Sequence, residues 1–303
     1  MRNRYLTFFV VLCFLSKCTA TTVIVAVTPT GIVVGCDGKP VNTGGSGKAV
    51  KVFLLKQRFI VGNIDTETAE ATDTGRVLYD FPRWISHIDK KASSRVSVTE
   101  LSSIIKNDIP STFNFLIEPI KARQITKENA ARHGLDPDAY IVEYVVAGYE
   151  QGSAFVHWIT LLPDWDNHTV KNPIDVPLYQ EQGKRADSYI RPLGRHAGID
   201  AIQIADSDEQ RALAKRIPIE FGIMLKQGTF TLKQASNAVR SILAIEIKAE
   251  PCYVGFPLTI ITVPKTGKGW VKTYKTDVST LSRLPKANGA KQKNNPRSSP
   301  LPN

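Results

Sequence analysis

Long apolar runs, metal-binding spacings and the common hydrolase motifs are all scarce in this sequence. Its longest apolar stretch, near the N-terminus, has about a dozen residues, whereas a helix that crosses a bilayer needs about 20. The five histidines follow no metal-ligand spacing, and neither a serine elbow nor a zinc-protease motif occurs. The sequence therefore predicts no membrane span, no metal site, and neither a serine-elbow nor a zinc hydrolase.

A basic stripe of the kind that binds nucleic acid is also missing, although the formal net charge is +11. The first 20 residues contribute three of these charges and the last 20 contribute four, so residues 21–283 carry only +4. We therefore expect no nucleic-acid partner. Binding of a polyanion or an envelope surface by the basic C-terminal tail stays open as an alternative.

The N-terminus has the layout of a secretory signal peptide. MRNR supplies two arginines, YLTFFVVLCFL is a short apolar core, and Cys18 and Ala20 place small residues at the third and first positions before Thr21. We assign residues 1–20 to this leader and expect a secreted or periplasmic protein that begins at Thr21. A lipoprotein attached through Cys18 is the alternative, which the charged Lys17 disfavours.

Removal of the leader would give Thr21 a free α-amine beside its own hydroxyl. An ordinary α-amine has a pKa of about 7.7–8.0, so part of it is neutral near pH 7 and can accept the hydroxyl proton. One residue would then supply both nucleophile and base. The alternative is that Thr21 and Thr22 only begin a β-strand, where threonine is common.

Two β-branched runs follow, TTVIVAV and GIVVGC, joined by the turn sequence TPTG. Pairing Thr28 with Gly31 in an antiparallel hairpin places Thr21 opposite Gly38, so Asp37 arrives beside the new N-terminus. Because both strands are apolar on both faces, we expect the sheet to be covered on both sides and Asp37 to be partly desolvated. A carboxylate in such surroundings needs a cationic partner.

The candidate partner is Lys51, at the start of a second pair of apolar runs that flank KQRF. Pairing Leu55 with Ile60 would place Lys51 opposite Ile64, at the open end of this hairpin. An ordinary strand-edge lysine in water is the alternative for Lys51.

A helix is expected to follow this hairpin, because Asp65 and Thr66 are good N-cap residue types. A helix N-terminus offers free backbone N–H groups and a partial positive charge. The backbone N–H groups near Asp65 and Thr66 would therefore suit an oxyanion.

The order of these residues resembles that in the β-subunits of the proteasome and of the related bacterial ring protease, which are N-terminal nucleophile hydrolases. The likeness rests on Thr21-Thr22, then Gly31, then Asp37, then Lys51-Val52, and GCDGK is particularly similar to the bacterial form. VVAGYEQGSAFVHWITL resembles their central hairpin. The segment from LKQASNAVRS to TVPKTGKGW resembles their late helix, glycine-containing loop and closing hairpin.

The resemblance implies a role for each matching residue. Thr21 would attack a carbonyl group, Asp37 would hold Lys51, and the charged Lys51 would lower the pKa of the Thr21 amine so that it is available as a base. A covalent acyl-enzyme would form and water would hydrolyse it, with no metal or organic cofactor. The substrate would be a peptide or a small amide, and assembly into a homo-oligomer is typical of the family.

Two departures from the family pattern concern the site. The family usually has glycines where the helix begins, whereas this chain has Asp65 and Thr66, whose side chains would crowd an oxyanion. In the late loop the family usually has a serine before a glycine pair, whereas this chain has Val254 before Gly255. A catalytically degenerate protein that keeps the fold and serves as a scaffold or binding protein is therefore the alternative to an enzyme.

The expected fold is α+β, with two packed antiparallel sheets and helices on both outer faces. The resemblance makes this a four-layer αββα sandwich formed by residues 21–283, followed by a disordered basic tail, residues 284–303. Apolar spacing predicts a helix over residues 77–88 with a kink at Pro82, a second from residue 98 that ends at Pro110, and a third over residues 235–243.

Two cysteines, Cys36 and Cys252, remain after removal of the leader. The resemblance brings the late loop, which contains Cys252, near the first hairpin. Export to an oxidising compartment permits a disulfide between them, whereas an apolar strand cysteine is more often a small buried residue. Both states are compatible with the sequence.

Overall fold

The computed structural model describes most of the body of the chain. The described residues are 22–38, 50–64, 68–71, 76–130, 132, 140–180, 189–194, 231–249 and 254–275. Outside them lie the predicted signal peptide and tail together with Thr21, Asp65, Thr66 and Cys252.

Two five-stranded antiparallel sheets dominate the structure. The first sheet has the order β12-β1-β2-β13-β14, with strands β1 (Thr22–Thr28), β2 (Gly31–Cys36), β12 (Tyr189–Gly194), β13 (Leu258–Pro264) and β14 (Trp270–Tyr274). The second has the order β11-β8-β7-β4-β3, with strands β3 (Val52–Leu55), β4 (Phe59–Asn63), β7 (Val142–Glu150), β8 (Ser153–Leu161) and β11 (Ile174–Gln180). Two short strand pairs accompany the sheets: β5 (Thr68–Ala71) with β6 (Arg76–Asp80), and β9 (Pro163–Asp164) with β10 (Thr169–Val170).

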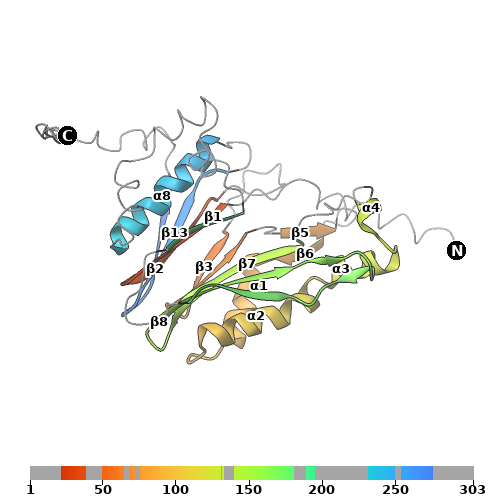
Figure 1. Ribbon diagram of the computed structural model, residues 1–303, viewed down its shortest axis with the longest axis horizontal. Coiled ribbons are helices and arrows are strands. Elements are labelled where there is room, and N and C mark those ends of the chain that lie inside the picture. Colours follow the sequence, from red (N-terminus) through yellow and green to blue (C-terminus); the bar gives the residue numbers. More distant parts are fainter. Residues whose placement is uncertain are drawn as a thin grey trace, which may run out of the picture.

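Helices pack on the outer faces of the two sheets (Figure 1). On the first sheet lies α8 (Leu232–Ala249), and the core on the second sheet includes residues of α1 (Phe81–Lys91), α2 (Val98–Thr112), α3 (Asn114–Ala122) and the short α4 (Lys127–Ala130). Of the helices in the described ranges, none combines the length and the apolar character that a bilayer crossing requires.

The strands of the first hairpin are buried on both faces. Val23 and Val25 of β1 belong to the core between the sheets, together with Val145 of β7, whereas Ile24 belongs to the core beneath α8. Successive side chains of a strand point to opposite faces, so every residue of β1 is buried. The structure is thus mixed α+β with two antiparallel sheets, and this packing is compatible with a sandwich.

The register predicted for the first hairpin is confirmed. Thr28 pairs with Gly31, and the pairs continue back to Val23 opposite Cys36. The Thr28 hydroxyl oxygen accepts hydrogen bonds from the Thr30 and Gly31 amides at 3.2 and 3.0 Å, which closes the turn. Because a slip by one residue would move every side chain to the other face, this turn decides which residues reach the core between the sheets.

The register predicted for the second hairpin is wrong by one residue. Leu55 pairs with Phe59 rather than with Ile60, so the loop between the strands is one residue shorter than expected. Lys56 and Gln57 adopt positive φ angles of 49° and 57°. Residues other than glycine seldom take this conformation, and nothing in the two side chains signals it in advance.

The shift changes the neighbour of Lys51 but not its end of the hairpin. The Asn63 amide donates to the Lys51 carbonyl oxygen at 2.8 Å, so Lys51 lies opposite Asn63 rather than Ile64. Lys51 is still at the open end of the hairpin, as predicted.

The helix predicted to begin at Asp65 or Thr66 is wrong. The described chain resumes in strand β5, which pairs with β6, and the first helix after β4 begins only at Phe81. The helix predicted from residue 77 is therefore also wrong at its start, because residues 76–80 pair with β5 as strand β6 and Val77, expected on the apolar face of the helix, is exposed. The oxyanion role predicted for Asp65 and Thr66 therefore has no helix N-terminus to support it.

Candidate active site

The predicted partners Asp37 and Lys51 form a buried ion pair. Asp37 directly follows β2 of the first sheet, and Lys51 directly precedes β3 of the second. The Lys51 Nζ atom lies 3.2 Å from Asp37 Oδ1 and 3.1 Å from Oδ2, so one ammonium group bonds both carboxylate oxygens. Neither side chain is accessible to solvent. The pair joins the two sheets at one edge of the core between them.

The backbone of Thr22 is the third component of this site. Its amide nitrogen donates to Asp37 Oδ1 at 3.1 Å, and the Asp37 amide donates to the Thr22 carbonyl oxygen at 3.4 Å. The Thr22 nitrogen also forms the peptide bond to Thr21. The ion pair therefore lies next to the peptide bond that links Thr21 to Thr22.

Burial of this pair carries an energetic cost. Moving a carboxylate and an ammonium group out of water costs several kcal/mol per ion, and their attraction offsets the cost only when the hydrogen bonds are good. Asp37 accepts at least three, two from Lys51 and one from Thr22. Well-packed apolar residues in the same place would often stabilise the fold as much. Stability alone therefore does not explain a fully buried ion pair where the strands end, and we treat the pair as a candidate functional site.

The late loop closes over the same edge, as the sequence resemblance implies. The Gly38 amide donates to the Gly255 carbonyl oxygen at 3.0 Å, which ties the end of the first hairpin to the segment before β13. A Cβ atom on Gly38 would lie 2.4 Å from the Pro257 carbonyl oxygen, so glycine is required at this close approach. Val254, the residue in place of the family's serine, is fully buried.

The second sheet lies opposite the start of β1 at this edge. A Cβ atom on Gly62 of β4 would lie 2.8 Å from the Val145 side chain and 3.7 Å from the Val23 side chain, so these residues of three strands pack together. Glu143 lies on the same face of β7 as Val145, two residues nearer this edge. Its carbonyl oxygen accepts from the Ile64 amide at 3.0 Å.

Glu143 is a site residue that the sequence pattern alone does not reveal. It is an isolated acid in the otherwise apolar run VEYVVAG, and this isolation is its only sequence signal. Burial raises the pKa of the Glu143 carboxyl group to about 7, against a smaller opposing effect of the Trp158 indole. A carboxyl group that titrates near neutral pH at this edge is a candidate for substrate contact.

The structure brings two of the predicted site residues, Asp37 and Lys51, into contact. The structure shows the ion pair between them, while their catalytic roles stay a prediction. The other predicted site residues, Thr21, Asp65 and Thr66, lie outside the described ranges. Cys36 is buried in β2, and because Cys252 also lies outside these ranges, a disulfide between them stays open. Within the described ranges, no three His, Cys, Asp or Glu side chains are grouped to hold a metal ion.

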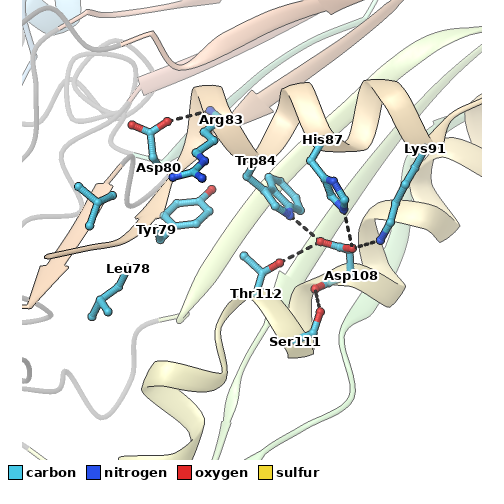
Figure 2. A pocket seen from close by; sticks show the side chains of 11 residues that line it. Leu78, Tyr79, Asp80, Arg83, Trp84, His87, Lys91, Asp108, Ser111 and Thr112 are labelled. Atoms are coloured by element: carbon cyan, nitrogen blue, oxygen red, sulfur yellow. Dashed lines mark hydrogen bonds and ion pairs between the residues drawn. The ribbon is translucent and has the colours of Figure 1, made fainter.

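A hollow of about 510 Å³ lies between α1, α2 and β6 (Figure 2). At its centre, Asp108 of α2 accepts from Trp84 Nε1 at 2.7 Å and from Thr112 Oγ1 at 2.9 Å, and it forms an ion pair with Lys91. Figure 2 shows these side chains converging on the Asp108 carboxylate. Because the acid is already bonded to residues of both helices, we assign this cluster to the docking of α1 on α2.

The same contacts act on the ionisation of Asp108. Partial burial works to raise the pKa of its carboxyl group, but the hydrogen bonds from Lys91, Trp84 and Thr112 outweigh burial and hold the pKa below its ordinary value. Because the pKa of Asp108 is lower in the folded protein than in the unfolded chain, its ionised carboxylate stabilises the fold at pH values above its ordinary pKa. This stabilisation is lost as the pH falls through the folded-state value.

Asp108→Asn is expected to lower the free energy of unfolding at pH 7 by about 1–2 kcal/mol, because Lys91 loses its carboxylate partner at a half-exposed site. The loss of stability that the wild-type protein shows below about pH 4 should be smaller in the variant. Urea unfolding at neutral and at acid pH measures both effects. The control is Glu118→Gln, which removes an exposed ion pair with Lys121 and should change stability by less than about 0.5 kcal/mol. Equal losses in the two variants would contradict the assignment.

Comparison of the chain with models of known protein families gave no match, and comparison with curated protein sequences gave none either. The resemblance to the proteasome β-subunits thus stays a prediction from the residues quoted above. A function must be inferred from the chain's own residues and geometry.

Proposed function

We propose that this protein is an exported threonine-type peptidase or amidase whose nucleophile is Thr21, exposed by removal of residues 1–20. The observation that carries the proposal is the fully buried Asp37–Lys51 ion pair beside the peptide bond between Thr21 and Thr22. The fold we propose is the four-layer αββα sandwich of the N-terminal nucleophile hydrolases. Two packed sheets with helices on their outer faces support it.

The reaction would proceed through an ester on Thr21. The hydroxyl oxygen attacks the carbonyl carbon of the substrate amide, and the α-amine accepts the hydroxyl proton. The carbon–nitrogen bond then breaks, and the departing amine takes up that proton. Water adds to the ester, returns a proton to the Thr21 oxygen and releases the acid, so the net reaction is hydrolysis of one amide bond.

Lys51 and Asp37 would set the charge around the amine. A cation close to an amine disfavours the protonated form of the amine and lowers its pKa, so more of it is available as a base at neutral pH. Asp37 bonds the ammonium group with both oxygens and also accepts from the Thr22 amide, which holds the cation near the start of β1. Because water is excluded from the pair, its charges act through a medium of lower dielectric constant than water.

A scaffold or binding protein with a degenerate site is the second candidate function, and one observation favours it. The resemblance implies a helix N-terminus that would stabilise the oxyanion, whereas β5 begins at Thr68, where that helix would run. Stabilisation of an oxyanion would then depend on individual backbone N–H groups. If the protein is an enzyme, we therefore expect a slow one.

The exported protein is expected to begin at Thr21, because Cys18 and Ala20 supply the small side chains that a signal peptidase requires. N-terminal sequencing together with intact-mass measurement tests this expectation. Ala20→Glu should block the cut and leave an uncleaved, inactive chain. A start at Val23 or later, or a lipid on Cys18, would remove the nucleophile and with it the proposed function.

A further inference from the structure

Glu143 lies at the same edge of the core between the sheets as the buried ion pair. Val145 of β7 packs against Gly62, and Gly62 packs against Val23 of β1. Two residues outward from Val145 on the same face is Glu143, and two residues outward from Val23 in the sequence is Thr21. The carboxyl group is thus placed to face a molecule that enters beside the start of β1.

On β8, the described neighbours of this carboxyl group are uncharged. Thr160 lies opposite Glu143 on β8 and is buried, and Trp158 lies on the same face of that strand. Across the part of the chain that the structure describes, no lysine, arginine or histidine forms an ion pair with Glu143. The other titratable groups described at this edge, Asp37 and Lys51, pair with each other. Glu143 therefore has no cation of its own among the described residues.

We propose that Glu143 receives a cationic group of the substrate, so that the preferred substrates are peptides or amides with a lysine-like or arginine-like side chain next to the cleaved bond. This rests on the proposed function, since Thr21 decides where that bond lies. A carboxylate that has lost much of its hydration gains a partner when a cationic side chain enters. A neutral side chain of similar size gives no such compensation, so the charge of the substrate is selected.

The ionisation of Glu143 gives this selection a pH dependence. Burial raises the pKa of its carboxyl group to about 7, so the group is mostly neutral at about pH 5.5 and mostly charged at about pH 8.5. The preference for a cationic over a neutral substrate should therefore increase with pH across this range. Titration of the Thr21 amine affects both substrates alike and cancels in the ratio of their kcat/KM values.

The test uses two fluorogenic peptide amides that differ only in arginine or citrulline at the residue whose carbonyl group is attacked. The wild-type protein is expected to favour arginine by about 10- to 100-fold in kcat/KM at about pH 8.5, the range for a hydrogen bond to a charged group. Glu143→Gln should remove the preference and still cleave the citrulline substrate. Glu150→Gln, at the far end of β7, is the matched control and should retain the preference.

A binding measurement separates this inference from the proposed function. Thermal unfolding with uncleavable arginine and citrulline peptides should show a larger stabilisation by arginine, which Glu143→Gln abolishes. If both substrates are cleaved equally, or if Glu143→Gln keeps the preference, the inference fails while the hydrolase stands. Glu143-dependent binding without hydrolysis would support the cation site and overturn the hydrolase. Neither hydrolysis nor a difference in binding would overturn both.

Discussion

Thr21→Ala is expected to abolish covalent labelling of the exported protein by a threonine-directed peptidyl electrophile, with a fall in rate of at least about 10³-fold. The substitution removes the hydroxyl oxygen that attacks the electrophile, and the remaining amine cannot form the ester. Intact-mass measurement after incubation with the electrophile reports the labelled fraction directly. Hydrolysis of peptide amides should be lost in parallel.

Two further variants make this result specific. Thr21→Ser keeps a hydroxyl group beside the amine and should retain labelling. Thr22→Ala tests whether the neighbouring threonine is the nucleophile instead, and it should still label at Thr21. Labelling that persists in Thr21→Ala would contradict the proposal, and absence of labelling in correctly cut wild-type protein would favour the scaffold.

Lys51→Met is expected to lower the free energy of unfolding by about 3–5 kcal/mol, because it leaves the fully buried Asp37 carboxylate without its cation. Methionine fills a similar volume, so the effect comes chiefly from the lost charge rather than from a cavity. The variant should also label much more slowly, since the Thr21 amine would be more fully protonated. Urea unfolding at neutral pH and labelling rates measure the two effects.

The control for this result is Lys121→Met, which removes an exposed lysine paired with Glu118 and should cost less than about 1 kcal/mol. The double variant Asp37→Asn with Lys51→Met should recover part of the lost stability, because no unpaired charge stays buried. Recovered stability should not restore labelling. A Lys51→Met protein as stable as the control would show that the ion pair does not stabilise the fold by the expected amount.

The first hairpin and the partners at its open end could be predicted because the signals are local. A turn with proline and glycine sets the register, and β-branched residues on both faces predict coverage on both sides, which the buried β1 confirms. The third predicted helix, over residues 235–243, is also confirmed, since these residues lie in α8. Its apolar stripe, which includes Ala235, Val239 and Leu243, packs into the core against the first sheet. The register of the first hairpin was thus enough to predict that Asp37 lies beside the start of β1.

Both proline predictions for the helices are wrong, each for its own physical reason. Pro82 lies in the first turn of α1, where a missing N–H group costs nothing, and Asp80 caps the helix by accepting from the Arg83 amide at 2.7 Å. The helix therefore begins at Phe81 and needs no kink. Sequence spacing alone cannot tell a proline that breaks a helix from one that starts it.

Pro110 lies inside α2 without ending it. The helix continues to Thr112, whose hydroxyl donates to the Asp108 carboxylate at 2.9 Å, and the Ser111 hydroxyl donates to the Asp108 carbonyl oxygen at the same distance. The Phe113 amide then donates to the Ile109 carbonyl oxygen at 2.9 Å. These side-chain hydrogen bonds and the burial of Ile109 and Phe113 in the core offset the lost backbone hydrogen bond, and that burial depends on the rest of the fold.

Glu143 escapes prediction because its surroundings are assembled from distant parts of the chain. Gly62, Val23 and Val145 belong to three strands of two sheets, and only their packing shows which face Glu143 occupies. Its desolvation likewise comes from neighbours on other strands, among them the buried Thr160. Chemistry that depends on such long-range packing has no signature in a short stretch of sequence.

Asp37, Lys51 and the Thr22 amide all lie on the C-terminal side of the bond that the proposed cut would break. Breaking the bond before Thr21 alters none of these three groups. Under the proposed function, the uncut chain would be a latent zymogen, because the Thr21 nitrogen is then part of a peptide bond and cannot accept the hydroxyl proton. The proposed activity would then begin only where residues 1–20 are removed, so proteins that meet the chain before that step would not be exposed to it.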